Sequence, residues 1–192
     1  MKPQRAQSNR KEPQRLFMKK KEKIVFKGYD SSKYDKPSVT TDILVFTIEN
    51  KKLKILLIKR KNPPFKGRWA IPGGFVEMDE DLEECALREL KEETGVEKAN
   101  LIQLHTFGKP DRDPRTRVIT VAYITFIPYN QLQFKANSDA KQARLFPVYT
   151  LPKLAFDHNE IIKFAIEFIK GHIFKSNLFK HFLSEKIEGE EQ

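Results

Sequence analysis

An acidic segment between glycines holds the residues whose types and spacing could do chemistry. In "GGFVEMDEDLEECALRELKEETGV", residues 73–96, Glu89, Glu92 and Glu93 are crowded onto neighbouring turns of an expected helix, with Arg88 beside them. At about 100° per residue the three acids fall within an arc of about 100° that borders the apolar stripe of the helix. Mutual repulsion and partial desolvation disfavour three such anions unless a positive charge lies among them. The segment is therefore either a solvated helix face or a site that a cation completes.

A hard divalent cation suits these ligands. Carboxylate oxygens favour Mg²⁺, with Mn²⁺ as a possible substitute, and Mg²⁺ in proteins is commonly shared between carboxylates and substrate phosphates. Gly73 and Gly74 precede the helix, and without side chains their backbone could approach a metal or a phosphate closely. Helix geometry alone leaves the metal site and the solvated face both open.

Two helices and several strands must position this segment. The helix that carries the acids can be capped by Asp79 or Asp81 and ended by Gly95 in a left-handed turn. A second helix is expected over residues 157–170, with Gly171 just past its end. Apolar and β-branched runs predict strands at residues 43–48, 53–59, 69–71, 101–107, 116–127 and 143–148, the first two forming a hairpin. This order predicts a mixed sheet between helices.

The spacing of the acidic segment matches a known motif. Gly74, five residues, Glu80, seven residues, Arg88-Glu89-Leu90, one residue, Glu92-Glu93, one residue and Gly95-Val96 fit the Nudix box at every defined position. From ordinary residue frequencies, such a coincidence has a chance of about one in 10⁸. The chain resembles a Nudix hydrolase over residues 37–172, and "GRWAIPGG" and "LPKLAFDH" resemble one branch of that family.

The resemblance implies a fold, a reaction and roles for residues. It implies a Nudix-type α/β/α sandwich that hydrolyses a nucleoside diphosphate linked to another moiety. Glu89 and Glu93 would bind Mg²⁺, the Gly73 carbonyl would complete the shell, and Glu92 would be a further ligand or orient the attacking water. Arg88 would hold the glutamates in place, and together with Glu89 and Glu92 it forms the expected catalytic set. Glu80 and Gly95 would be structural or lie outside the ligand shell, and Gly74 would approach the substrate.

The substrate is addressed by a second set of residues. The loop "DRDPRTRVITVAY" resembles ADP-ribose pyrophosphatases, and its arginines could reach phosphates or the terminal ribose, unless the loop is simply solvated. These arginines are Arg112, Arg115 and Arg117. Phe75 could stack on a base, Trp69 is expected in the core, and His158 is expected to start a helix. Gln142 and Leu145 replace a glutamate and a tryptophan that relatives often carry, and Asp139 is expected to cap a loop.

Two other functions stay open. Some relatives with this loop and "LPKLAFDH" are transcription regulators that sense ADP-ribose and carry a winged-helix domain after the Nudix domain. Residues 171–192 resemble the opening of such an extension, but regulators tend to degrade the box, which is intact here. A third possibility keeps the catalytic residues and changes the substrate to an oxidised nucleoside triphosphate or a capped RNA end.

Composition bounds the remaining expectations. Of the formal net charge of +10, residues 1–23 carry +7, so residues 1–36 are expected to be a basic, flexible segment whose contact with nucleic acid is possible. The apolar runs are far shorter than the roughly 20 residues that cross a membrane. The single cysteine, Cys85, cannot form an internal disulfide, which favours a cytoplasmic setting. Family members are often homodimers, so a homodimer is a further possibility.

Overall fold

A computed structural model of the chain describes residues 30–134 and 142–173. The chain divides into two compact units, residues 1–36 and residues 37–192. In the first unit, the described part holds a single 3-10 turn, Ser31–Lys33. The rest of the expected basic segment, residues 1–29, and residues 174–192 of the expected C-terminal extension lie outside the described residues. No helix in the described part is long and apolar enough to span a membrane.

The second unit is built on one mixed β-sheet. Its strands are β1 (Ser38–Glu49), β2 (Lys52–Lys59), β3 (Trp69–Ala70), β4 (Gly73–Phe75), β5 (Ile102–Phe107), β6 (Val118–Phe126) and β7 (Ala143–Pro147). The order is β3-β2-β1-β6-β5, while β4 also pairs with β1 and β7 with β2. β1 and β6 are parallel and all other pairs are antiparallel. The expected hairpin is β1–β2, joined at the turn after Glu49.

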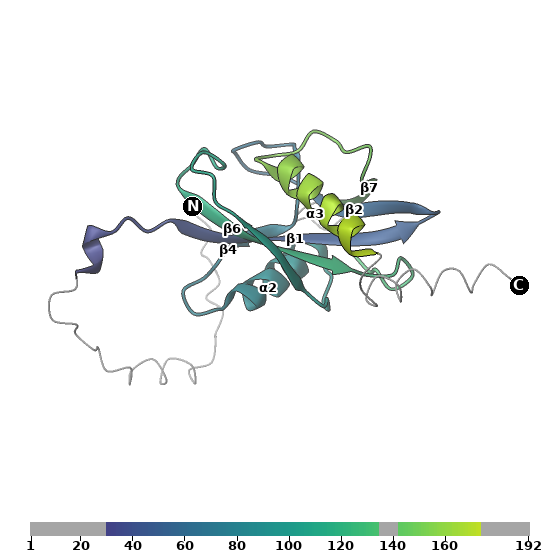
Figure 1. Cartoon of the computed structure of the whole chain (residues 1–192), viewed down its shortest axis with the longest axis horizontal. Helices are drawn as coiled ribbons and strands as arrows, with labels where there is room; N and C mark the ends of the chain where they lie inside the picture. The colour runs from purple at the N-terminus through teal and green to yellow at the C-terminus, as the bar shows by residue number, and fades with distance from the viewer. Residues whose placement is uncertain (1–29, 135–141, 174–192) are drawn as a thin grey trace, which may run out of the picture. The chain divides into compact units, whose positions relative to one another are not determined.

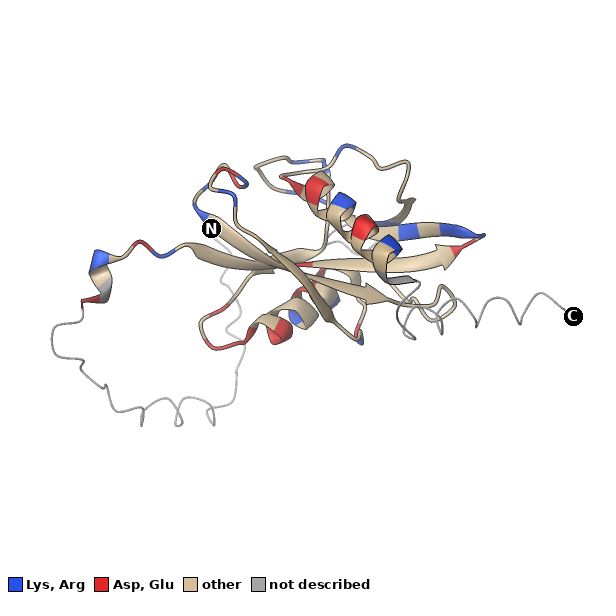
Figure 2. Cartoon of the chain, viewed as in Figure 1, with Lys and Arg blue, Asp and Glu red and all other residues tan. Residues whose placement is uncertain are grey.

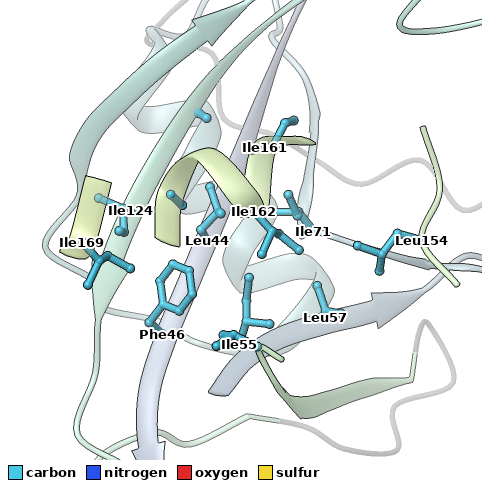
Figure 3. Packing of buried hydrophobic residues seen from close by; sticks show 13 residues of the cluster. Leu44, Phe46, Ile55, Leu57, Ile71, Ile124, Leu154, Ile161, Ile162 and Ile169 are labelled. Carbon is cyan, nitrogen blue, oxygen red and sulfur yellow. The ribbon is translucent and has the colours of Figure 1, made fainter. Parts of the chain in front are cut away.

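Two helices cover opposite faces of the sheet, α2 (Leu82–Thr94) and α3 (His158–Ile173) (Figure 1). Alternate residues of β1 face the two layers, because successive side chains of a strand point to opposite sides. Ile43 and Val45 pack in the cluster that contains Leu90 of α2. On the other face, Leu44 and Phe46 pack with Ile161, Ile162 and Ile169 of α3 (Figure 3). The α/β/α sandwich expected from the sequence is confirmed.

The ends of α2 follow from its sequence. Asp81, rather than Asp79, is the N-cap: its side chain accepts hydrogen bonds from the backbone of Glu83 and Glu84, and the Glu84 side chain accepts from the Asp81 N–H. Gly95 ends the helix with a left-handed φ of 81°, a conformation that glycine adopts at little cost. Figure 2 shows how acidic residues gather on α2 and on the segment that leads into it.

Two expectations about the elements were wrong. β4 was not expected, because "GGF" has no strand-like alternation; its pairing with Thr40, Thr41 and Asp42 of β1 makes it a strand. Gly171 does not terminate the second helix, which continues to Ile173. A Cβ at Gly171 would meet nothing within 4 Å, so no packing demand singles out this glycine.

Candidate active site

A cavity of about 410 Å³ lies where the expected catalytic segment meets the sheet. Its walls come from β1, from the β4 segment, from α2, from the loop between β5 and β6, and from the residues that lead into α3. Among the sequence-predicted residues it brings together Gly73, Gly74, Phe75, Arg88, Glu89, Glu93, Arg112 and Arg115. Segments far apart in the sequence therefore share one pocket.

The two glycines let the backbone lie directly against the carboxylates. The Gly73 N–H donates to Oε2 of Glu93 at 3.0 Å. A Cβ at Gly74 would overlap the Glu89 carboxylate, and a Cβ at Gly73 would overlap the carbonyl oxygen of Thr41 on β1. Only glycine fits both positions without movement of a neighbour.

Arg88 organises the acids of α2. Its guanidinium donates to both carboxylate oxygens of Glu80, at 2.8 and 2.6 Å, and to Oε1 of Glu89 at 2.8 Å. The hydrogen bonds from Arg88 lower the pKa of Glu80 to about 2, and the hydrogen bond to Glu80 raises the pKa of Arg88. Glu80 thus fixes Arg88, and Arg88 fixes Glu89.

The three clustered glutamates occupy different environments. Glu93 is buried at 6% exposure and Glu89 is half-buried in the pocket wall. The side chain of Glu92 is 61% exposed, is not part of the wall, and lies 3.6 Å from Nη1 of Arg88. The structure therefore brings two of the three expected metal-binding acids into the pocket.

The residues present fit a hard divalent cation. Within the described residues, no three His, Cys, Asp or Glu side chains form a ready-made metal cage. Mg²⁺ does not need one, because it keeps several waters and is commonly held by one or two carboxylates together with substrate phosphates. Glu89 and Glu93 supply such a pair beside the bare backbone of Gly73 and Gly74.

The three loop arginines do not act as one solvated group. Arg112 is buried and donates to both carboxylate oxygens of Asp157, at 3.0 and 2.8 Å. Arg117 lies outside the pocket wall and donates to the carbonyl of Lys109 at 3.2 Å. Arg112 and Arg115 therefore line the pocket, Arg112 with its guanidinium held by Asp157, whereas Arg117 does not line it. Contact of the three arginines with substrate stays a prediction.

Arg115 lies on the pocket wall. A bidentate pair with Asp113, with a closest N–O distance of 2.7 Å, holds the guanidinium in place and raises its pKa. Its Cζ lies 5.1 Å from the ring centroid of Phe75 and 5.5 Å from that of Phe156. Phe75 is 41% exposed, so its ring is accessible at the pocket mouth.

Sequence reasoning missed several wall residues: Asp42, Arg60, Asp113 and Phe156. Asp42 did carry a signal, because it is the one charged residue in the apolar strand run "TTDILVF". Arg60 and Phe156 carry no local signal, since their contact joins distant segments, with Cζ of Arg60 4.7 Å from the ring centroid of Phe156. Asp113 pairs with Arg115 two residues further on, a contact that the sequence analysis did not consider.

Of the other residues that the sequence analysis singled out, His158 lines the pocket, and Trp69, Gln142 and Leu145 do not. Trp69 packs against the core with its ring edge-on to Phe146 at 4.7 Å, as expected for a core aromatic. His158 is the first residue of α3 and also lines the pocket. Gln142 is exposed, Leu145 packs against the cluster under α2, and Asp139 lies outside the described residues.

The fold is an α/β/α sandwich, and its pocket holds a pair of carboxylates next to a strand that begins with two glycines. Comparison of the chain with protein-family models assigns it to a family. The model of the NUDIX domain matches residues 39–165. The chain therefore belongs to the Nudix family, as the spacing of the acidic segment predicted.

Three individual proteins show which members of the family the chain is similar to. The chain is 47% identical to an ADP-ribose pyrophosphatase of Methanocaldococcus jannaschii, over 77% of this chain and 86% of the relative. It is 38% identical to an ADPR responsive transcriptional repressor, NtrR, of Acinetobacter baylyi, over 71% of this chain but 56% of that protein. The NUDIX domain of Shewanella oneidensis NrtR, solved with ADP ribose, superimposes with a TM-score of 0.65 at 35% identity, covering 74% and 95% of the two chains.

Proposed function

We propose that this Nudix pyrophosphatase hydrolyses ADP-ribose to AMP and ribose 5-phosphate with Mg²⁺ as its cofactor. The observation that carries the proposal is one pocket with an acidic wall, Glu89 and Glu93 beside Gly73, and a basic wall that includes Arg60 and Arg115. A diphosphate bound to a divalent cation needs both kinds of wall.

Arg60 supports an anionic ligand in particular. It donates to the carbonyl of Pro64 at 2.9 Å and forms no ion pair with any described residue. Burial and the nearby charge of Arg115 lower the pKa of its guanidinium, and the charges of Glu93 and Asp113 oppose this effect. Asp113 already pairs with Arg115, so Arg60 is the guanidinium of this wall that has donors left for a phosphate.

Each acidic or basic residue of the catalytic segment has its own role in the proposed reaction. Glu89 and Glu93 hold the cation, and Arg88 keeps Glu89 oriented. When bound, Mg²⁺ neutralises charge on the phosphoryl oxygens and acidifies a bound water. Glu92 is a further ligand or the group that orients the attacking water. For either role its side chain must turn away from Arg88, whose Nη1 lies 3.6 Å from Oε2 of Glu92. Positioning for in-line attack is then the main task of the protein.

The surroundings of the pocket suit a substrate with two arms. A second cavity of about 330 Å³ shares Arg112 and Phe156 with the first, and it is also lined by Lys109, Asp111 and Glu160. We assign one arm of ADP-ribose to each cavity. Phe75 and Arg115 offer flat faces on which the base can stack.

A regulator that binds ADP-ribose without cleaving it is the alternative, and the similarity to NtrR favours it. Against it, every defined position of the Nudix box is occupied by the expected residue. Oxidised nucleoside triphosphates and capped RNA ends are alternative substrates. A homodimer, contact of residues 1–36 with nucleic acid and a cytoplasmic setting stay predictions.

The test is incubation of the full chain with Mg²⁺ and a substrate panel, followed by product identification. AMP and ribose 5-phosphate from ADP-ribose support the proposal. A monophosphate and pyrophosphate from a triphosphate would reassign the substrate. Tight binding of ADP-ribose without any product would make the protein a sensor.

Replacement of Glu93 tests the metal assignment. The amide oxygen of Glu93→Gln can still accept the Gly73 N–H, so the fold should be kept while the charge is lost. We expect turnover to fall at least about a hundredfold with little change in thermal stability. Glu97→Gln, a change of the same kind at an exposed residue just beyond α2, is the control. An unchanged rate in Glu93→Gln would remove the assignment.

A further inference from the structure

His158 connects the start of α3 to the segment that carries the catalytic glycines. Its Nδ1 accepts a hydrogen bond from the backbone N–H of Ile71 at 2.9 Å, although the two residues are 87 positions apart in the sequence. Both are buried, with exposures of 4% and 2%. Ile71 lies between β3 and β4, so its N–H has no strand partner in the ladder.

Three consecutive residues of this segment are each fixed by a different element. Ile71 is held by His158 at the start of α3. The carbonyl of Pro72 accepts from the Ile43 N–H of β1 at 2.8 Å. The Gly73 N–H donates to Glu93 of α2 at 3.0 Å. The position of the Gly73 carbonyl therefore depends on both helical layers and on the sheet, and His158 supplies the only side-chain contact from the α3 layer among these three.

The His158 ring is fixed in one tautomer. Because Nδ1 accepts a hydrogen bond, the ring proton lies on Nε2, which is 3.6 Å from Oδ1 of Asp42. Asp42 is itself held, since Thr120 donates to its Oδ2 at 2.7 Å and Nη2 of Arg112 lies 3.6 Å away. Burial lowers the pKa of His158, and the charges of Asp42 and Asp157 oppose this effect. The neutral ring is the form that can accept from Ile71.

We propose that His158 is a positioning residue: by accepting the Ile71 N–H, it sets the Gly73 carbonyl relative to Glu89 and Glu93 and thereby the affinity of the site for a divalent cation. The inference rests on the proposed function only in taking this site as the metal site. A purely structural histidine would affect folding and leave cation affinity unchanged. Removal of a group that holds a metal ligand in place without touching the metal typically lowers metal affinity by about 10–100-fold.

The test compares replacements that keep or remove the acceptor. His158→Asn places an oxygen near the position of Nδ1, His158→Gln places its amide nearer to that of Nε2, and His158→Phe keeps a ring without an acceptor. Binding of Mn²⁺ to the full chain is measured by electron paramagnetic resonance, and exchange of the Ile71 amide hydrogen is measured without metal. His105→Phe is the matched control, because His105 stacks on Phe164 at 4.7 Å and does not line the pocket.

We expect Mn²⁺ affinity to fall at least about tenfold and Ile71 exchange to accelerate in His158→Phe and His158→Gln, with His158→Asn close to the wild type. The control should bind Mn²⁺ as the wild type does. If His158→Phe does not fold, the Asn and Gln variants decide the question alone. A folded Phe or Gln variant with unchanged Mn²⁺ affinity, or an Asn variant as impaired as the Gln variant, overturns the inference. Both readouts need no substrate, so a failure to cleave ADP-ribose would count against the proposed function and not against this role.

Discussion

At the scale of single residues, the two adjacent glycines of the pocket, Gly73 and Gly74, contact different neighbours, so their replacement by alanine should have different effects. A Cβ at Gly73 would overlap backbone, the Thr41 carbonyl, whereas a Cβ at Gly74 would overlap the end of the Glu89 side chain. Backbone cannot move without disturbing the β1–β4 pairing, but a glutamate can rotate. Gly73→Ala should therefore damage the fold, and Gly74→Ala should damage the cation site.

We expect Gly73→Ala to lower the free energy of unfolding by about 1–3 kcal/mol. Gly74→Ala should change it by less than about 1 kcal/mol and weaken Mn²⁺ binding at least about tenfold. Denaturant unfolding and Mn²⁺ titration measure the two effects. Gly171→Ala is the control, because a Cβ there meets nothing within 4 Å. Equal loss of stability in the two pocket variants would contradict the distinction.

How far the sequence could predict the site depends on where each residue's contacts come from. Arg88, Glu89 and Glu93 lie on one helix, so their spacing alone groups them. The spacing could not show that Glu92 points out of the pocket, because that depends on how α2 rests on β4. Arg60 and Phe156 meet only through the tertiary fold, and no local pattern predicts such a contact.

At the scale of elements, α2 is the helix whose position matters most, and its N-cap can be tested directly. Asp81 accepts two backbone hydrogen bonds at 2.9 Å, from Glu83 and Glu84. Replacing an N-cap aspartate by alanine typically costs about 1 kcal/mol. We expect Asp81→Ala to lower the free energy of unfolding by about that amount, as measured by denaturant titration.

Asp79→Ala is the matched control, since the sequence alone allowed either aspartate to be the cap and the structure selects Asp81. Asp79 is exposed, so its replacement should change the free energy of unfolding by less than about 0.5 kcal/mol. A loss for Asp81→Ala that is as small as the loss expected for Asp79→Ala would show that the capping hydrogen bonds add no measurable stability.

Elements were predictable where the pattern is local. The apolar runs of β1, β2 and β6 and the periodic apolar face of α3 indicate their own conformations. β4 could not be predicted, because its three residues are held as a strand only by pairing with β1. Gly171 misled the prediction because glycine after an apolar helix usually marks its end, whereas here the helix continues.

At the scale of the whole molecule, the pocket lies where the two layers and the sheet contribute charged groups to one buried region. Asp42 comes from β1, Arg112 from the loop between β5 and β6, and Asp157 and His158 from the start of α3. Removing one member of such a buried set leaves an uncompensated charge or an unpaired polar group. The stability of the fold and the geometry of the site are therefore coupled through these residues.

That coupling predicts a dependence of stability on pH. Burial lowers the pKa of His158 below its ordinary value of 6.5, although Asp42 and Asp157 raise it, and Arg112 and Arg60 lower it further. Below about pH 6.5, His158 is protonated in the unfolded chain but stays neutral in the folded chain. Its contribution to the free energy of unfolding is therefore fully present above about pH 6.5 and is lost as the pH falls toward the pKa of the folded state. One unit below 6.5 this loss is at most about 1.4 kcal/mol. Between about pH 7.5 and 5.5 the melting temperature of the wild type should therefore fall more than that of His158→Asn, which has no titrating group at position 158. If both proteins lose stability in parallel, other groups determine the acid sensitivity and His158 does not.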